Sequence, residues 1–359
     1  MRLLIIGVNQ AGHMGSYFAA AARQLGIEHM IMDANAAEAT GRLSQMFHWR
    51  LRGKRPARLT SFGRQVIDVC RDARPELVLT TGRAPLEVAH VKEMRALGSV
   101  VINYSTDDPW NRGLLAPYFL EALPAYDAIF TTRRANIEDF IRCGVRNVHY
   151  LAFGYDPEVH RPWPENLPAA PPCDVMFVGG CDTDRLPLIT ALVDSGLNLA
   201  LFGGYWNRHG ATRAYWRGMA GQDAIRSASA TAKICLCLVR RANRDGHVMR
   251  SFEAAAIGGC VLAEDTEDHR ELFSDAAFYF ATQRELIEQA KRLVDDAETR
   301  KRLAQRLRAR LAYSDQTYAN RLATMFRLSP KRSLPGERRV ISHSSLASNL
   351  PDAGLRNPL

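Results

Sequence analysis

The 359-residue sequence lacks any long hydrophobic run. Its longest stretch of small and apolar residues, 254–263, has ten residues and includes two glycines, whereas a membrane-spanning helix needs about 20. An apolar strand is expected to begin within two residues of the N-terminus, which leaves no room for a signal peptide. We therefore predict a cytoplasmic protein, and proportions of 47% hydrophobic and 24% charged residues predict a folded globular one.

Cysteine and lysine are also scarce. The seven cysteines are odd in number and form no C-x-x-C pair, so we expect neither a disulfide framework nor a zinc site. Only six of the 47 basic residues are lysine; the others are arginine, whose planar guanidinium suits phosphate and carboxylate. No helix-turn-helix, zinc-finger or RNP-like pattern accompanies the net charge of +9, and we predict no nucleic-acid partner.

Proline is concentrated in one stretch that divides the chain. Residues 155–173 contain six prolines and no hydrophobic periodicity, which predicts an interdomain linker. The predicted division is an N-terminal domain (1–160), a linker (161–172), a C-terminal domain (173–312), a final helix (313–329) and a disordered tail (330–359).

Apolar strands alternate with helices in both halves of the chain. Strands are predicted at 2–8, 27–32, 75–80, 99–104 and 126–131, and after the linker at 174–178, 197–202, 232–238, 260–263 and 276–280. Helices are predicted at 16–25, 62–71, 85–97, 135–143, 284–295 and 298–312. This alternation predicts an α/β protein with two Rossmann-like, doubly wound parallel sheets. The spacing G-x4-G-x2-G from Gly7 is not a dinucleotide fingerprint, so NAD binding is not predicted.

Two helix starts carry candidate caps. Thr60 or Ser61 is expected to cap the helix at 62–71, and Ser314 or Asp315 the final helix, because their side-chain oxygens can accept from the first helical N–H groups. Cys235 and Cys237 alternate along one predicted strand, so we expect them to share a buried face.

The segment 245–263, DGHVMRSFEAAAIGGCVLA, predicts a loop, a short helix ended by two glycines, and a buried strand. A helix N-terminus at 246–248 would present N–H groups and the positive end of its dipole to a phosphate. Glu253, two turns into the helix, would then reach sugar hydroxyls. The alternative is an ordinary helix of the sheet with a solvated Glu253.

Seven residues separate Asp245 from Glu253, and this segment resembles the Glu-x7-Glu signature of retaining glycosyltransferases of the two-domain GT-B fold, with Asp as the first acid. R-S-F-E-A-A-A-I-G-G, Glu271-Leu272-Phe273 and Thr317-Tyr318 with Arg321 more specifically resemble the CgeB-like (spore-coat type) group 1 glycosyltransferases, although Gln316 stands at a family His. The resemblance covers 173–326 well and implies a nucleotide-sugar donor whose ribose binds Glu253. It also implies that the domain at 173–312 binds this donor, that the domain at 1–160 binds the acceptor, and that the helix at 313–329 crosses back to the N-terminal domain.

The other donor-binding candidates follow the predicted strands. Glycine pairs allow close backbone approach to a base or diphosphate, and basic side chains would neutralise its charge; the alternative for each arginine is a surface charge. The predicted donor-binding residues are Gly179, Gly180, Arg185, Gly203, Gly204, Lys233, Arg240, Gly246, His247, Arg250 and Glu253. No DxD-type metal site is predicted. No cofactor is predicted either, because the nucleotide diphosphate-sugar is the donor substrate.

The predicted catalytic residues are Glu253, Asp245, Arg250 and His13. The resemblance implies retention of anomeric configuration without a strong enzymic base. In an inverting reaction His13, after the first strand, would be that base. A nucleotide-sugar epimerase of the same fold and a non-catalytic sugar- or nucleotide-binding relative are the remaining alternatives.

Two N-terminal segments suggest further contacts. Residues 42–58 place six basic side chains (Arg42, Arg50, Arg52, Lys54, Arg55 and Arg58) around Met46, Phe47 and Trp49. They would dock an anionic acceptor or make a peripheral contact with an anionic membrane, or form a solvated loop. Asp107 and Asp108 follow a predicted strand, where they would contact a sugar acceptor or cap a helix. The acceptor itself is not identified.

Overall fold

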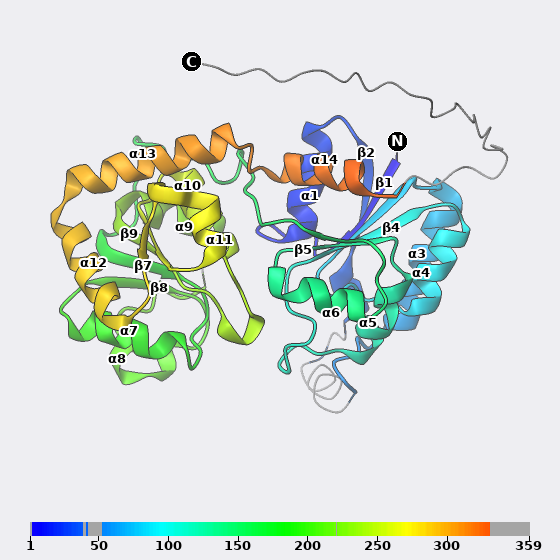
Figure 1. The fold of residues 1–359 in the computed structure, drawn as a ribbon, viewed down its shortest axis with the longest axis horizontal. Helices are drawn as coiled ribbons and strands as arrows, with labels where there is room; N and C mark the ends of the chain where they lie inside the picture. Colours follow the sequence, from blue (N-terminus) through cyan, green and yellow to red (C-terminus); the bar gives the residue numbers. More distant parts are fainter. Residues whose placement is uncertain (1, 39–40, 42–51, 220, 331–359) are drawn as a thin grey trace, which may run out of the picture.

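The computed structural model describes residues 2–38, 41, 52–219 and 221–330 and shows two α/β domains side by side (Figure 1). The predicted disordered tail lies outside the described residues from 331 onward, as do residues 42–51 of the basic segment. Within the described ranges, no helix combines the length and the apolar composition needed to cross a membrane.

The N-terminal domain is built on a six-stranded parallel sheet of order β2-β1-β3-β4-β5-β6. Its strands are β1 (Arg2–Gly7), β2 (Glu28–Asp33), β3 (Leu77–Thr81), β4 (Val100–Ser105), β5 (Ala128–Thr131) and β6 (Val148–Tyr150). Its helices are α1 (Met14–Gln24), η1 (Ala34–Ala37), α3 (Leu59–Ala73), α4 (Val88–Ala96), α5 (Pro117–Ala122), η2 (Leu123–Ala125), η3 (Arg134–Asn136) and α6 (Ile137–Arg142). Leu4 and Ile6 of β1 pack toward α3 to α5, while Leu3 and Ile5 pack toward α1, which explains the continuous apolar run.

The C-terminal domain has a five-stranded parallel sheet of order β11-β10-β9-β7-β8. Its strands are β7 (Cys173–Val178), β8 (Leu199–Phe202), β9 (Ala232–Cys237), β10 (Val261–Glu264) and β11 (Phe278–Phe280). Its helices are α7 (Arg185–Asp194), η4 (Trp206–Arg208), α8 (Gly210–Arg213), α9 (Gln222–Thr231), η5 (Arg241–Asn243), α10 (Met249–Ile257), α11 (Glu267–Phe273), η6 (Ser274–Ala276), α12 (Gln283–Asp295) and α13 (Ala297–Tyr313). The prediction of two doubly wound sheets is confirmed. Cys235 and Cys237 share the face covered by α9, α10 and α13, as the alternation predicted.

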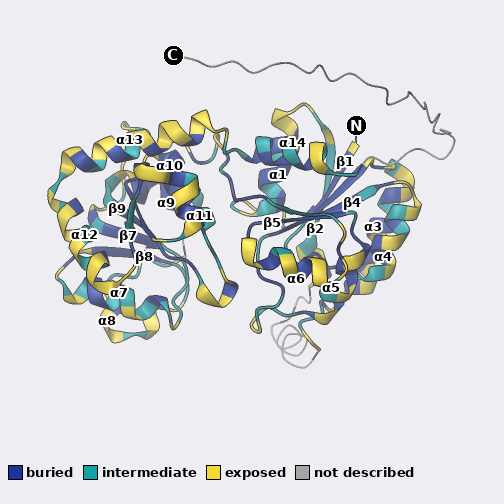
Figure 2. Cartoon of the chain, viewed as in Figure 1, coloured by how far each residue is buried: buried dark blue, intermediate teal, exposed yellow. Residues whose placement is uncertain are grey.

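The last helix, α14 (Tyr318–Leu328), leaves the C-terminal domain and packs on α1 (Figure 1). The Tyr318 ring stacks on Tyr17 at 4.9 Å between centroids, with an interplanar angle of 11°. Leu322 and Met325 join the same N-terminal core. Figure 2 shows that the central strands are buried and that the outer faces of the covering helices are exposed.

Both predicted pairs of helix caps are wrong. α3 begins at Leu59, one residue before Thr60, and its N-cap Arg58 makes no side-chain capping bond. Burial of Leu59 at 1% exposure draws this residue into the helix. For α14 the cap is Thr317, which accepts from the Asn320 N–H, while Asp315 accepts from the Thr317 hydroxyl.

Candidate functional site

The loops that follow the parallel strands of the two domains meet at the domain interface. Asn243, in the loop after β9, hydrogen bonds to Asp107, Asn111 and the Asp108 backbone N–H, in the loop after β4. In each sheet the strand order reverses once, between β1 and β3 and between β7 and β9. Ligands of open α/β sheets bind at such reversals, beyond the carboxyl ends of the strands.

The two glycine pairs divide into packing residues and accessible ones. A Cβ on Gly203, whose φ is +126°, would lie 2.3 Å from the Gly179 carbonyl oxygen, so these two glycines allow β7 and β8 to end in contact. The indole N–H groups of Trp206 and Trp216 occupy the carbonyls of Gly179 and Gly203. Nothing within 4 Å would meet a Cβ on Gly204, and Gly180 faces only the Gly204 carbonyl at 3.8 Å. Gly180 and Gly204 therefore leave room for a ligand.

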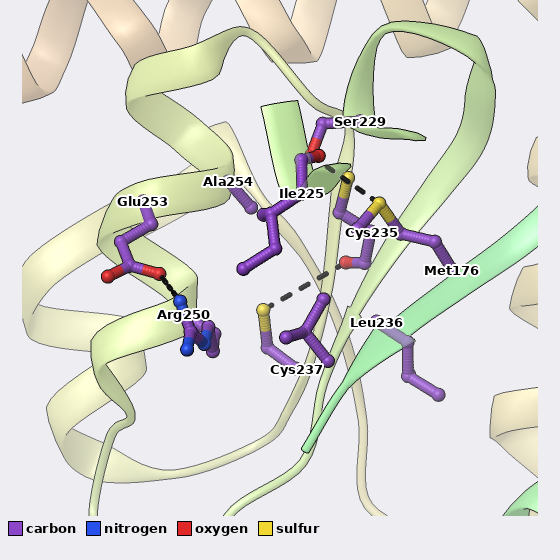
Figure 3. Close-up of a pocket in the computed structure, with 10 residues that line it drawn as sticks. Met176, Ile225, Ser229, Cys235, Leu236, Cys237, Arg250, Glu253 and Ala254 are labelled. Carbon is purple, nitrogen blue, oxygen red and sulfur yellow. Dashed lines mark hydrogen bonds and ion pairs between the residues drawn. The ribbon is translucent and has the colours of Figure 1, made fainter. Parts of the chain in front are cut away.

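Glu253 lies on α10 and is buried at the domain interface. The Arg250 guanidinium, one turn earlier, donates to its Oε2, as Figure 3 shows. The Glu253 side chain is 1% exposed and that of Arg250 is 30% exposed. Met176, Cys235 and Cys237 line the other side of the enclosed space (Figure 3). This space is about 20 Å³, room for about one water molecule.

Two N-terminal side chains face the other oxygen of Glu253. His160 Nδ1 accepts from the Asp156 N–H at 3.0 Å, so the ring proton is on Nε2, which lies 3.4 Å from Glu253 Oε1. The Tyr17 hydroxyl lies 3.1 Å from the same Nε2 and 3.4 Å from Glu253 Oε1. It also accepts from Gln222 Nε2 at 2.6 Å. One buried polar cluster thus joins α1 and His160 of the N-terminal domain to α9 and α10 of the C-terminal domain.

The charge state of Glu253 follows from its partners. Burial alone would raise the pKa of the carboxyl, but the Arg250 guanidinium and His160 outweigh burial and lower the pKa to about 2. Glu253 is therefore a carboxylate at neutral pH, and both of its oxygens are hydrogen-bond acceptors. Burial, followed by the Glu253 charge, raises the pKa of the Tyr17 hydroxyl well above its usual value, so Tyr17 stays a neutral donor.

Asp245 forms an ion pair with Arg133 of the opposite domain. Arg133 Nε and Nη2 lie 2.6 and 2.5 Å from Asp245 Oδ1, and the Arg240 N–H lies 3.2 Å from Oδ2. The Arg133 and Asp245 side chains are 4% and 6% exposed. The predicted catalytic acid is thus engaged by protein groups on both oxygens in this conformation.

Arg244 precedes Asp245 and also crosses the interface. Its guanidinium forms a fork on Asp108, with contacts of 2.6 and 3.0 Å, and reaches Asp139 at 2.7 Å. The Asp108 side chain is 3% exposed and accepts in addition from Asn136. Asp108 was predicted to contact a sugar acceptor or to cap a helix. The structure adds a third role, because Asp108 also links the two domains through Arg244.

Gly246 and His247 complete the loop before α10. A Cβ on Gly246 would lie 2.3 Å from Asp268 Oδ2, which explains the glycine. The His247 ring is fully buried; Nδ1 donates to Asp268 at 3.0 Å and Nε2 accepts from the Phe153 N–H at 3.1 Å. Burial lowers the pKa of His247. Both ring nitrogens have protein partners in this conformation, and donor binding by His247 stays a prediction.

Arg185, Arg240 and Lys233 are the remaining basic residues that were predicted to bind the donor. Arg240 and Lys233 lie at opposite ends of β9 in the C-terminal sheet. Arg185 is 6% exposed and donates to the Gly180 and Leu238 carbonyls, whereas the Arg240 side chain is 42% exposed, at the carboxyl end of β9. Lys233, also predicted to bind the donor, is at the other end of the sheet. It lies at the amino end of β9 and pairs with Asp174 at 2.9 Å, because a strand of six residues separates its two ends.

A groove of about 410 Å³ opens between the domains beside this cluster, within the range of small-molecule sites. Its lining includes Gly12, Ser16, Tyr17, Asp156 and Gln222. His13 is exposed at the N-cap of α1, next to the groove but not among its lining residues.

Part of the basic segment is engaged within the protein. Lys54 Nζ donates to the Arg112 and Leu115 carbonyls at 2.9 and 3.2 Å, and Arg55 pairs with Glu87 at 2.7 Å. The charged groups of Lys54 and Arg55 therefore form contacts within the N-terminal domain. Arg42, Arg50 and the aromatic residues of the segment lie outside the described residues.

Sequence reasoning missed Tyr17, His160 and Arg133. Their partners Glu253 and Asp245 are more than 90 residues away, and no local spacing connects them. The one usable signal was that Tyr17 and Arg133 follow predicted strands, where ligand-binding residues of this fold class gather.

Residues 185–327 match a family model described as "Glycosyl transferase-like". This range contains α10 with Arg250 and Glu253. A search of curated proteins found no sequence relative.

Three solved structures share the fold over nearly the whole chain. Sucrose-phosphate synthase from Thermosynechococcus elongatus has 14% identity and a TM-score of 0.64, over 91% of this chain and 98% of that one. A structure described as trehalose-6-phosphate from E. coli bound with UDP-2-fluoro glucose has 12% identity and a TM-score of 0.63, over 92% and 100%. T4 phage BGT in complex with its UDP-glucose substrate has 15% identity and a TM-score of 0.54, over 92% and 100%. These neighbours show that the chain has the two-domain GT-B fold, and its residues 185–327 are similar to a glycosyl transferase-like family.

Proposed function

We propose that the protein transfers a sugar from a nucleotide diphosphate-sugar to an acceptor, with the donor held by the C-terminal domain. The observation that carries this proposal is the Arg250–Glu253 pair on α10, at the interface edge of a glycosyl transferase-like domain. Glu253 would bind the donor ribose, and Gly180 and Gly204 would admit the base or diphosphate. We further propose that the protein is a CgeB-like glycosyltransferase.

The leaving diphosphate gains negative charge as the glycosidic bond breaks. Arg250, the exposed Arg240 and the N-terminus of α10 are the groups that would stabilise it, and preorganised charges of this kind are usually the largest contribution to catalysis. The reaction is proposed to need no metal, which transfer rates with EDTA and with Mg²⁺ would test. The groove beside Tyr17 is the proposed acceptor site.

The first test is a thermal-shift screen with UDP-, GDP-, dTDP- and CMP-sugars. UDP-sugars come first, because two neighbours were solved with them. A ligand at 100 times its dissociation constant adds ~2.7 kcal/mol to folding stability, so we expect a clear rise in melting temperature for one base. No shift with any of them would contradict the proposal. Incubation of the hit with and without acceptors then separates transfer, donor isomerisation and binding alone.

His13 decides between the stereochemical alternatives. In the proposed retaining reaction the departing phosphate oxygen takes the acceptor proton, so we expect a product with the donor's anomeric configuration and measurable turnover by His13→Ala. A missing base in an inverting reaction costs about 10²–10⁴-fold. NMR of the first-formed product reports the anomer; inversion together with loss of turnover would make His13 the base.

A further inference from the structure

The three consecutive residues Asn243, Arg244 and Asp245 all bind the N-terminal domain, and we name this segment the clamp. We propose that the clamp holds the two domains closed over Glu253 and that a nucleotide-sugar reaches Glu253 only after the clamp opens. This inference rests on the proposed function, because it concerns entry of the donor.

The clamp is anchored by charged contacts on buried partners. Arg244 makes its two-pronged contact with Asp108, whose side chain is 3% exposed, and Asp245 pairs with Arg133 at 4% exposure. Charge-assisted, forked hydrogen bonds are the strong ones. Asn243 adds neutral bonds to the same loop of the N-terminal domain, including one to the Asp108 backbone. Side chains from both domains therefore stabilise the closed arrangement.

The closed arrangement leaves no room for a nucleotide at Glu253. Its side chain is 1% exposed, Tyr17 and His160 cover Oε1, and the adjoining space is about 20 Å³. Both covering residues belong to the N-terminal side of the interface. A ribose can bind this carboxylate only if the N-terminal domain withdraws them, which requires the clamp to release.

The clamp is also suited to release. Arg244 has φ 50° and ψ 39°, a left-handed conformation that is unfavourable for a side chain other than glycine or asparagine. Its side chain is 41% exposed, so water can replace its partners as they separate. The described contacts between clamp and N-terminal domain are polar, as in interdomain interfaces that move.

A closed clamp lowers the apparent donor affinity. The apparent dissociation constant equals the intrinsic one divided by the fraction of open molecules. Weakening the clamp raises that fraction, so the donor should bind more tightly. A residue that contacts the donor directly would show the opposite sign when substituted.

The test uses Arg244→Gln and Asp108→Asn, which remove one charge from the same contact on opposite domains. Arg241→Gln is the matched control, because Arg241 lies in the same loop but pairs with Glu264 of its own domain and is 68% exposed. We expect a larger radius of gyration by small-angle X-ray scattering in both clamp variants, and a dissociation constant for UDP-glucose about three- to tenfold lower by calorimetry. Arg241→Gln should match the wild type in both measurements.

Unchanged scattering with equal or weaker UDP-glucose binding in both folded variants would overturn the inference. So would an equal effect of Arg241→Gln, because that contact lies within one domain. Larger radii in the clamp variants, with no binding of any nucleotide-sugar by any of the proteins, would contradict the proposed function while supporting the clamp. Using a variant on each domain keeps the test decisive if one substitution prevents folding.

Discussion

Glu253→Gln is expected to lower nucleotide-sugar affinity about tenfold or more. The substitution replaces a carboxylate, paired with Arg250 and held ionised, by a neutral amide of the same shape. A hydrogen bond to a charged group contributes about 1.5–3 kcal/mol, which corresponds to about 10- to 150-fold in affinity. Calorimetric titration of the variant with the nucleotide-sugar found in the screen measures the loss.

The same variant should also unfold more easily, by about 2 kcal/mol, because the guanidinium of Arg250 loses its buried counter-charge. Glu288→Gln is the control, since its carboxylate is 56% exposed and pairs with Arg284 on the outer surface of α12. We expect that control to change neither affinity nor stability by more than about 0.5 kcal/mol. If folded Glu253→Gln bound the donor with full affinity, Glu253 would not be a donor ligand.

Acid should erase this contribution to stability. The pKa of Glu253 is lowered to about 2 in the folded protein from an ordinary value of 4.5. The folded state therefore binds the proton more weakly than the unfolded chain, and the stabilisation is complete above pH 4.5. It is lost as the pH falls toward 2. The stability difference between wild type and Glu253→Gln should shrink over this interval, which chemical denaturation at several pH values would show.

Asp245→Ala should be among the most destabilising single substitutions in the chain. It leaves the Arg133 guanidinium, 4% exposed, without its counter-ion, and breaking a buried pair costs about 3–5 kcal/mol. Arg133→Ala should cost a similar amount. The double variant should cost clearly less than the sum of the two, because the second removal takes away an already unpaired charge. Urea denaturation of the four proteins gives the coupling free energy.

The exposed pair Arg284–Glu288, with side chains 86% and 56% exposed, provides the comparison cycle. Its coupling should stay within about 0.5 kcal/mol. Strictly additive losses at Arg133 and Asp245 would mean that the two side chains are stabilised independently. A folded Asp245→Ala of unchanged stability that loses turnover would instead favour the direct catalytic role implied by the Asp-x7-Glu spacing.

The fold could be predicted because its signals are local. Buried parallel strands appear as continuous apolar runs, and the glycines after the strands and helices mark their ends. β6, Val148–Tyr150, was missed because three half-buried residues form no distinct run. The helix caps were misplaced because burial of Leu59 decided where α3 begins, and burial depends on the rest of the domain.

Only part of the site could be predicted, because its other residues are brought together by the fold. The spacing of Asp245 and Glu253 is visible along the chain, but Arg133, which neutralises Asp245, is 112 residues away. Lys233 has the charge of a phosphate ligand, but it is the second residue of β9 and so lies at the end of the sheet away from the glycine loops. Functional residues assembled from two domains cannot be paired without the fold.

The packing of α14 on α1 means that the N-terminal core is completed by the last helix of the chain. Tyr17 and Phe18 are covered by Tyr318, and Leu322 and Met325 complete that core. The ribosome adds these partners about 300 residues later, which at ~5–20 residues per second is about 15–60 s. During this time the first domain presents an unfinished apolar face. We therefore expect the nascent chain to be most prone to aggregation in the interval before α14 is made.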